Sequence, residues 1–318
     1  MPSLVQLQYV LELDRFRHFG LASRACHVTQ PTLSQQLQKL EDEVGIVLFD
    51  RTKKPILPTH EGARFLTQAK VVLREYERLL QSAMQPTDGS IGGDFRLAVI
   101  PTVASYLLPI FLKPFAKAHP QVRLLIEEMK TETILSELAE DRLDGAILAT
   151  PVDGSGFKAH PLYYEPFYAY FSPRHELLKQ KSIARDDLDM SEMWLLQDGH
   201  CFKDQVLDFC ARAGARALDQ ANVQFRSGSL DTLRRMVQSN QGHTLIPAMM
   251  ALSLRKDEQL AHVRPFRGPV PAREISLIYA RDHWKLAMIR AIEDGVACCL
   301  PAGIHRKPEK SYDVLEVG

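Results

Sequence analysis

The stretch TQPTLSQQLQKLE, residues 29 to 41, decides the fold of the first part of the chain. Its leucines recur at intervals of three and four residues, the spacing of a buried helical stripe; they are Leu33, Leu37 and Leu40. Thr29 is the expected N-cap, and Pro31 falls in the first turn, where proline is tolerated. The segment predicts a short helix with one buried face and one strongly polar face.

Further helices are expected before this segment, and a small β element after it. Apolar spacing predicts one helix from about residue 4 and another over about residues 21–26. VLFDRTKKPILPT, residues 47–59, is typical of two short strands joined by a basic turn. Two interpretations are open: a small bundle with a solvated polar face, or a helix-turn-helix that reads DNA. In the second, the DNA-facing side chains are Gln30, Thr32, Ser34, Gln35, Gln36, Arg51 and Lys53.

Net charge does not favour a nucleic-acid partner. The chain has 39 basic and 39 acidic residues, and residues 1–64 hold eight Lys/Arg against seven Asp/Glu, a net of +1. A DNA-binding role must therefore rest on the arrangement of side chains. The N-terminal residues lack the apolar run of a secretory signal, and no run reaches the length of a membrane span. We expect a cytoplasmic protein without membrane contact, where a disulfide forms only transiently.

A long helix is predicted from residue 59 to about residue 84. Its apolar stripe is too wide for an isolated solvated helix, so we expect it to pair with another copy of itself. PTDGSIGGD, residues 86–94, is rich in turn residues and marks a domain boundary.

Strand and helix patterns alternate beyond this boundary. Strands are expected at RLAVI (96–100), VRLLIEEM (122–129), GAILAT (145–150), YAYFS (168–172), WLLQD (194–198), VQFRS (223–227) and EISLIYA (274–280). Helices between the first three favour a mainly parallel sheet covered by helices. The later strands are expected to form a second α/β unit, with EISLIYA returning to the first, so that two lobes enclose a crevice. The tail from residue 302 is charged and is expected to fray.

GHCFKDQVLDFC, residues 199–210, carries two cysteines nine positions apart in a pattern that favours a helix. Nine helical steps separate two side chains by about 13 Å and half a turn, whereas a disulfide needs Cα atoms about 5.5 Å apart. Cys201 falls at the expected helix start, where the helix dipole and Lys203 favour a thiolate. The alternative is that both are small buried apolar residues, and this is how Cys26, Cys298 and Cys299 are interpreted.

The run FGLASRACHVTQPTLSQQLQKLEDEVGIVLFDRTKKPILPTHEG, residues 19–62, resembles the LysR-type transcriptional regulators. Its QPTLSQQLQKLE, LFDR and T-x-x-G elements carry the resemblance. The resemblance implies an α/β protein with an N-terminal all-α winged helix-turn-helix and a two-lobed effector domain like periplasmic binding proteins. The expected domains are 1–58 (DNA-binding), 59–85 (dimerising linker helix), 86–93 (hinge), 94–301 (regulatory: lobe I about 94–164 and 268–301, lobe II about 165–267) and 302–318 (flexible tail).

Within this family, three segments are similar to the peroxide-sensing branch: IPTVASYLLP, LLQDGHCFKDQVLDFCARAGA and SGSLDTLRRMV. The resemblance implies that Cys201 is the peroxidatic cysteine and Cys210 the resolving cysteine of a reversible disulfide switch. It also implies a peroxide pocket made of Thr102, Thr131, His200, Asp204 and Arg273.

The resemblance leads us to expect a DNA-binding regulator of oxidative-stress genes, and not an enzyme. Its expected partners are double-stranded promoter DNA, hydrogen peroxide, RNA polymerase, a cellular thiol reductant and further copies of itself, as a homodimer or homotetramer. No cofactor and no metal site are predicted. The nearest alternative is a LysR-type regulator of a small organic effector bound between the lobes. A thiol peroxidase would leave residues 1–85 unexplained, and a transport-associated binding protein would need an export signal.

Overall fold

A computed structural model describes residues 1–84, 91–150, 156–196, 201–211, 228–280 and 285–315. The chain divides into two compact units, Met1–Gln85 and Pro86–Gly318. Among the described residues, no helix has the length and apolar character needed to cross a bilayer.

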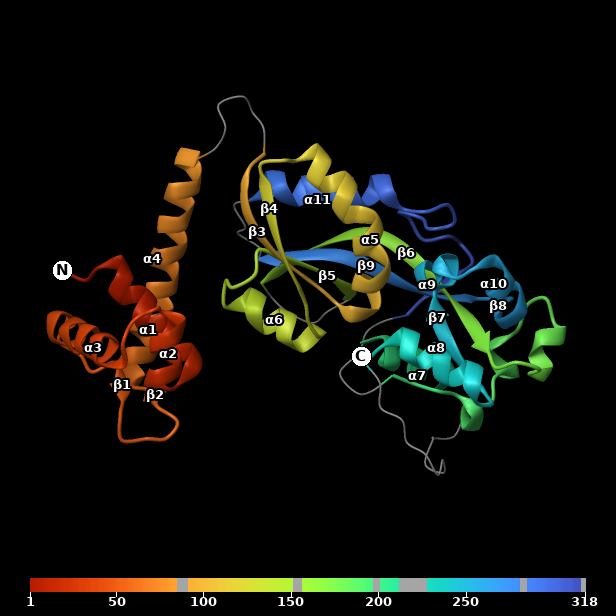
Figure 1. Cartoon of the computed structure of the whole chain (residues 1–318), viewed down its shortest axis with the longest axis horizontal. Coiled ribbons are helices and arrows are strands. Elements are labelled where there is room, and N and C mark those ends of the chain that lie inside the picture. The colour runs from red at the N-terminus through yellow and green to blue at the C-terminus, as the bar shows by residue number, and fades with distance from the viewer. Residues whose placement is uncertain (85–90, 151–155, 197–200, 212–227, 281–284, 316–318) are drawn as a thin grey trace. The chain divides into compact units, whose positions relative to one another are not determined.

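The first unit packs three short helices around a small apolar core. They are α1 (Leu4–Phe16), α2 (Phe19–Ala25) and α3 (Gln30–Val44), followed by the antiparallel strands β1 (Phe49–Asp50) and β2 (Leu57–Pro58) (Figure 1). Leu33, Leu37 and Leu40 are buried in this core, which confirms the predicted stripe. Thr29 caps α3 by accepting a hydrogen bond from Thr32 N, and Pro31 lies in the first turn. Helix α2 begins two residues earlier than predicted, because His18 Nδ1 accepts hydrogen bonds from Gly20 N and Leu21 N.

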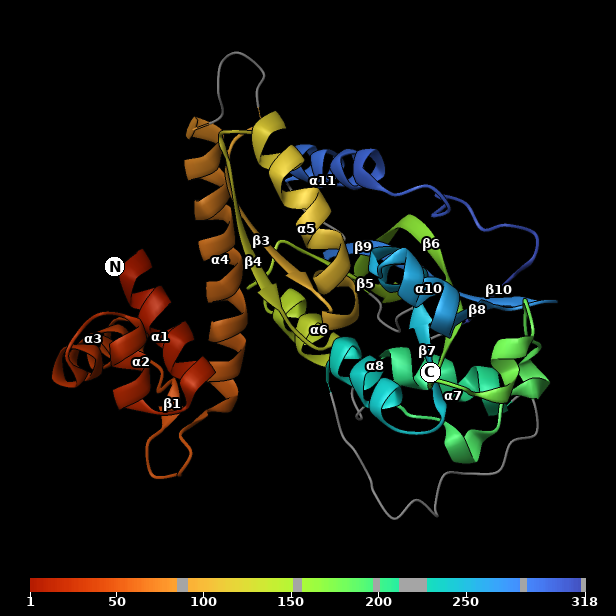
Figure 2. The same cartoon turned by 45° about the vertical axis from the view of Figure 1, so that its right-hand side comes forward.

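Helix α4 (His60–Met84) extends from this core as one long helix (Figure 2). The T-x-x-G sequence at its start has a physical explanation. Thr59 Oγ1 accepts a hydrogen bond from Gly62 N at 2.9 Å, and a Cβ at Gly62 would lie 2.0 Å from Leu48 O. A threonine cap and a residue without a side chain are thus both needed where α4 crosses the β element. Further along α4, Val72, Leu79 and Leu80 are exposed, Leu79 to 64%.

The second unit contains strands β3 to β10 and helices α5 to α11. Their bounds are β3 (Gly93–Val99), α5 (Pro101–Ala118), β4 (Val122–Glu128), α6 (Thr131–Ala139), β5 (Gly145–Thr150), β6 (Phe157–Phe171), α7 (Cys201–Ala211), α8 (Leu230–Ser239), β7 (His243–Pro247), α9 (Ala248–Ser253), α10 (Lys256–His262), β8 (Val263–Pro265), β9 (Val270–Ala280), α11 (Leu286–Cys299) and β10 (Tyr312–Val314). Three 3-10 turns, η1 (Glu176–Lys179), η2 (Arg185–Asp187) and η3 (Met190–Glu192), precede α7.

The strands form one curled sheet in the order β4-β3-β5-β9-β6-β7. Strands β3, β4 and β5 are parallel, but β9 runs antiparallel to both β5 and β6, and β7 is antiparallel to β6. The predicted parallel arrangement is confirmed for the first three strands, whereas the later strands β6, β7 and β9 pair antiparallel. The strand expected at residues 194–198 is also absent over its described residues 194–196, beside which Met193 forms an isolated bridge. The strand expected at 223–227 lies outside the described residues.

Two apolar cores make the two lobes. The core of lobe I lies between the sheet and α5, α6 and α11, and Figure 1 shows α5 and α11 together on one side of the sheet with α6 on the other. The core of lobe II gathers side chains from β6, β7, α7 and α8. Strand β6 joins the lobes, because its first part pairs with β9 and its last five residues pair with β7. This confirms the two-lobed architecture.

The C-terminal tail does not fray over its described residues. Strand β10 pairs in parallel with β9, and Leu315, which follows it, is fully buried in the core of lobe II. Leu315 N donates to Ala272 O at 2.8 Å, and Leu315 O accepts from Gln205 Nε2 of α7 at 3.2 Å. The prediction of a flexible tail is wrong for residues 302–315, because Leu315, an apolar residue in a charged segment, anchors the tail in the core of lobe II.

Candidate functional site

The polar face of α3 presents most of the predicted DNA-facing side chains to solvent. Gln30, Thr32 and Gln35 are exposed, and Ser34 and Gln36 are half-buried. Lys53 in the following turn is exposed and lies 3.9 Å from Asp50. These positions leave the predicted interface accessible in the first unit.

Arg51 has a structural partner in addition to its predicted contact with DNA. Its Nη2 pairs with the buried carboxylate of Glu41 and donates to Gln38 Oε1 at 3.2 Å. The other oxygen of Glu41 accepts a hydrogen bond from Leu48 N at 2.7 Å. Arg51 therefore neutralises a buried acid that holds the β element against α3, a role that the sequence pattern did not indicate.

Helix α7 carries both cysteines of the predicted switch. Its described residues are Cys201–Ala211, and both cysteines lie within them. Both cysteines are buried, and both thiols are free. Nine residues of α-helix separate their Cα atoms by about 13 Å, too far for a disulfide. Cys201 packs in the core of lobe I, whereas Phe202, Val206, Phe209 and Cys210 pack in the core of lobe II.

A fully buried guanidinium lies beside the start of α7. Arg273, on β9, donates from Nη1 to Thr102 Oγ1 at 2.9 Å and from Nη2 to Thr102 O at 3.1 Å. It also pairs with Glu165 on β6, with Nη2 to Oε2 at 2.8 Å, and both side chains are 0% exposed. The remaining oxygen of Glu165 accepts from Met249 N at 2.7 Å. Arg273 lies over the ring of Phe202, 5.3 Å from its centroid, so the network reaches the residue next to Cys201.

The electrostatics of Cys201 differ from the prediction. Burial raises the pKa of its thiol above the ordinary value, and the charge of Arg273, a hydrogen bond with the Thr131 side chain and one with Phe202 N oppose the rise. The charge of Asp204 adds to it. Burial therefore works against the predicted thiolate, while Arg273 and Thr131 work in its favour. Arg273, which the sequence placed in the pocket, is a cation that acts on the sulfur.

Cys210 lies in a more uniformly apolar environment. Burial raises the pKa of its thiol to about 11, and the charge of Arg185 opposes the rise. Its neighbour Phe209 packs edge-on against Phe266, with ring centroids 5.3 Å apart. This agrees with a cysteine that stays inert until the end of α7 leaves its core.

Four of the five residues predicted for the peroxide pocket fall in described segments. Thr131, Asp204 and Arg273 act on Cys201 directly, and Thr102 joins them through Arg273. His200 lies outside the described residues. Glu165 was missed, although a single acid within the apolar run LYYEPFYAYF is the kind of signal that marks a paired buried charge.

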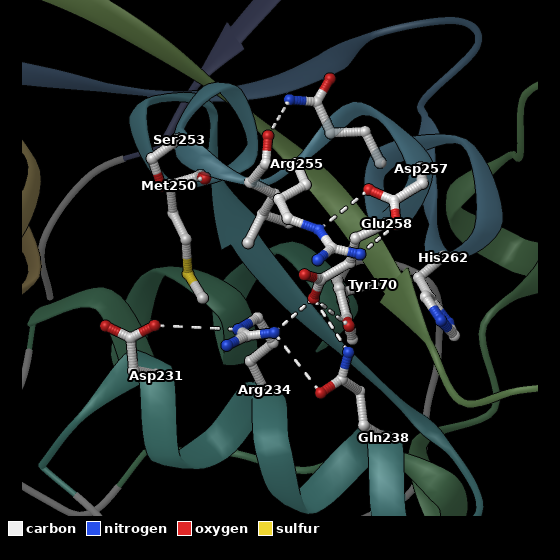
Figure 3. Close-up of polar contacts among 12 residues, drawn as sticks. Tyr170, Asp231, Arg234, Gln238, Met250, Ser253, Arg255, Asp257, Glu258 and His262 are labelled. Carbon is white, nitrogen blue, oxygen red and sulfur yellow. Dashed lines mark hydrogen bonds and ion pairs between the residues drawn. The ribbon is translucent and has the colours of Figure 1, made fainter.

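A second polar network fixes the framework of lobe II (Figure 3). Glu258 Oε1 on α10 accepts from Tyr170 Oη of β6 at 2.7 Å and from Gln238 Nε2 of α8 at 2.9 Å, and it pairs with Arg234. The segment SGSLDTLRRMV, quoted above for its resemblance, thus supplies a tie between α8, α10 and β6. This network lies in a different part of the chain from the contacts of Cys201.

Two family profiles together match most of the chain. Residues 4–63 match "Bacterial regulatory helix-turn-helix protein, lysR family", and residues 88–296 match "LysR substrate binding domain". A "Hydrogen peroxide-inducible genes activator" from Pectobacterium carotovorum is 37% identical over 273 residues, 86% of this chain and 88% of the relative. The "DNA-binding transcriptional dual regulator OxyR" of Escherichia coli is 36% identical over the same shares of both chains.

Among solved structures, a full-length OxyR variant from Pseudomonas aeruginosa has a similar fold. The TM-score is 0.73 at 32% identity, over 94% of this chain and 98% of that one.

Proposed function

The chain belongs to the LysR family of bacterial helix-turn-helix regulators, and on that premise we propose that it senses hydrogen peroxide and controls oxidative-stress genes. Its relatives include proteins named for induction by hydrogen peroxide. The observation that carries the proposal is the placement of Cys201, beside a buried cation and a hydrogen-bonding threonine, at one end of a helix whose other end holds Cys210. An organic effector would need neither cysteine.

The proposed chemistry balances in two steps. The Cys201 sulfur attacks one peroxide oxygen, the O–O bond breaks, and the thiol and peroxide become a sulfenic acid and water. The Cys210 thiol then attacks the sulfenic sulfur, so that an S–S bond forms and a second water leaves. Arg273 and Thr131 favour the thiolate needed for the first step, because each stabilises negative charge on sulfur. A cellular thiol reductant returns the disulfide to two thiols.

Disulfide formation is incompatible with an intact α7. The bond closes a loop of about ten residues, worth roughly 2 to 3 kcal/mol in chain entropy. Against this stand the loss of helical hydrogen bonds and the removal of Phe202, Val206 and Phe209 from the core of lobe II. Exposing three such side chains costs about 1.5 to 3 kcal/mol each, more than the chain-entropy term, so the free energy released by the reduction of peroxide must drive the rearrangement. The rearranged lobe then alters the regulation of transcription by RNA polymerase at the bound promoter.

A cysteine map tests the sensor. Reduced protein receives a brief, substoichiometric pulse of peroxide, and mass spectrometry then follows each of the five cysteines. We expect oxidation first at Cys201 and then a Cys201–Cys210 disulfide, with Cys298 unchanged as an exposed internal reference. Oxidation that follows exposure, with Cys298 ahead of Cys201, would instead favour the regulator of an organic effector.

The first unit supplies the proposed DNA contacts. Lys53→Ala should weaken binding to all sequences and lower the slope of log affinity against log salt by about one, because a phosphate contact releases counterions. Gln35→Ala should change sequence preference more than affinity. Arg51→Ala is a poorer test, since it also leaves the buried Glu41 unpaired. Unchanged footprints and salt slopes in both Lys53 and Gln35 variants would contradict this interface.

Helix α4 is the proposed surface for forming a homodimer or homotetramer in the cytoplasm. Val72→Glu places a charge on the exposed apolar stretch of α4 and should shift sedimentation toward the monomer. Thr67→Glu adds the same charge about 140° around the helix and serves as the control. Retention of the native mass in Val72→Glu would contradict pairing through this face.

A further inference from the structure

Two histidines and a glutamate converge in lobe II, on elements that the redox switch does not use. His175 follows β6, Glu192 ends η3, and His243 begins β7. One possible ligand atom from each lies within 4.8 Å of the other two, and His175 Nε2 is 3.3 Å from Glu192 Oε2. The three residues are 17 to 68 positions apart in the sequence, so only the fold brings them together.

His243 is the unusual member of this cluster. Its side chain is 0% exposed, and among the described residues neither ring nitrogen has a hydrogen-bond partner. Buried polar atoms are almost always bonded, so a histidine with two orphaned nitrogens implies a missing partner. A neutral imidazole has one ring nitrogen with a lone pair that can bind a metal ion.

The surrounding backbone holds the three side chains in place. Met193 and His243 form a parallel bridge, and Trp194 N donates to His243 O at 2.8 Å. Gly242, with φ of 105°, lets β7 approach η3 so closely that a Cβ there would lie 2.1 Å from Glu192 O. Phe171 stands beside both imidazoles, with ring centroids 4.6 Å from His175 and 5.6 Å from His243. Backbone pairing and aromatic packing therefore hold the three side chains close together in the folded lobe.

We propose that His175, Glu192 and His243 bind one divalent transition-metal ion of the zinc class. Two imidazole nitrogens and one carboxylate oxygen form a ligand set that zinc uses in proteins, with a fourth position left for water. Glu192 is 52% exposed, so an ion can enter from its side, while His243 supplies the buried end. The ion would tie η3 to β7 within lobe II.

Binding requires one rearrangement of protons. Leu177 N donates to His175 Nδ1 at 3.2 Å, so in the metal-free protein the ring hydrogen is on Nε2, facing Glu192. Coordination through Nε2 moves that hydrogen to Nδ1, with no net loss of protons, and gives up the hydrogen bond from Leu177. Glu258 in the same lobe offers no comparable site for a metal ion. Its carboxylate already accepts hydrogen bonds from Tyr170, Arg234 and Gln238, whereas the ring nitrogens of His243 accept none among the described residues.

Cobalt(II) titration of the reduced full-length protein tests the proposal, since cobalt reports its ligands through its visible spectrum. We expect d–d bands of a nitrogen and oxygen site without a thiolate-to-metal band, and displacement of cobalt by zinc. Glu192→Gln should weaken cobalt binding by roughly tenfold or more. Loss of a residue that merely hydrogen-bonds to a metal ligand typically weakens binding by about that much, and loss of a ligand should weaken it at least as much. His175→Gln should weaken it further. Glu176→Gln removes an equal charge from an exposed position beside His175 and should leave binding unchanged.

Two results would overturn this site. One is a spectrum dominated by thiolate ligation that disappears in a Cys298→Ser, Cys299→Ser protein, since these adjacent cysteines would then be the binding residues. The other is equal loss of affinity in Glu192→Gln and Glu176→Gln, which would indicate general surface charge. Both exposed glutamates are replaced by an isosteric residue, so misfolding does not obscure the comparison.

Discussion

The two ends of α7 carry the same residue in two different environments. At the first end, Cys201 packs in the core of lobe I and has Arg273, Thr131 and Phe202 N acting on its sulfur. Nine residues further along α7, Cys210 packs in the core of lobe II, where the charge of Arg185 opposes the effect of burial on its pKa. Burial raises the pKa of both thiols.

The difference teaches that reactivity here depends on which polar groups accompany burial. One cysteine is desolvated together with a cation and a hydrogen-bond partner, and the other with aromatic rings. Because the two ends belong to separate cores, bringing the sulfurs together must remove at least one end from its core. The following predictions test this contrast, beginning with the largest expected effect.

Replacing each cysteine by serine should give two clearly different effects on the response to peroxide. Cys201→Ser should abolish the response to peroxide, because the group that attacks the O–O bond is lost. Cys210→Ser should still be oxidised at Cys201 but should stop at a sulfenic acid or a mixed disulfide. A sulfenic-acid trap and transcription in vitro would measure both effects. A normal response from Cys201→Ser would remove the proposed mechanism.

Changing the buried ion pair should move oxidation rates in opposite directions while reducing stability in both variants. Arg273→Gln should slow oxidation of Cys201, and Glu165→Gln should accelerate it, because the guanidinium then acts on the sulfur without its counter-charge. Each substitution leaves a buried charge unpaired, at a cost of about 3 to 5 kcal/mol in the free energy of unfolding. Stopped-flow oxidation and urea unfolding give the two measurements. Rates that simply followed stability would contradict a charge effect.

Alkaline pH should destabilise the reduced protein through its buried thiols. A thiol whose pKa is raised in the folded state contributes stability that is present below its ordinary pKa near 9 and is lost as pH rises toward the folded value. For Cys210, with a folded pKa of about 11, this is at most about 3 kcal/mol between pH 9 and 11. Urea unfolding across this range should show the loss, and Cys210→Ser should reduce it. Identical profiles for both proteins would show that Cys210 is not the titrating group.

The smallest effect is expected from the hydrogen bond at Thr131. Thr131→Val preserves side-chain shape, removes one bond to the sulfur and should slow Cys201 oxidation up to about tenfold, as expected for roughly 1.5 kcal/mol. Thr244→Val makes the same exchange at a buried threonine in β7, whose hydroxyl donates to Trp194 O, and should not alter this rate. Equal slowing in both variants would point to a general loss of packing.

Local patterns predicted the first unit well. The cap at Thr29, the stripe of leucines and the T-x-x-G start of α4 all operate within a few residues, so one sequence is enough to identify them. The helix at residues 201–211 was predicted for the same reason.

Features that depend on contacts between distant segments could not be predicted in this way. Glu165 and Arg273 are 108 positions apart, and burial of Cys201 itself, which raises its pKa, also depends on the packing of distant segments. His175, Glu192 and His243 have no spacing motif, so the sequence indicated no metal site. Strand β10 lies in a charged segment, and only its pairing with β9 reveals it.

The anchoring of Leu315 has a consequence for hydrogen exchange. Amide protons near a chain end normally exchange with solvent quickly, since termini fray. The Leu315 amide is instead bonded to Ala272 O, and the Leu315 carbonyl is bonded to Gln205 in the middle of α7. We therefore expect protection of this amide to depend on an intact α7. Its exchange rate, read on a C-terminal peptide, would report melting of the helix without any label on either cysteine.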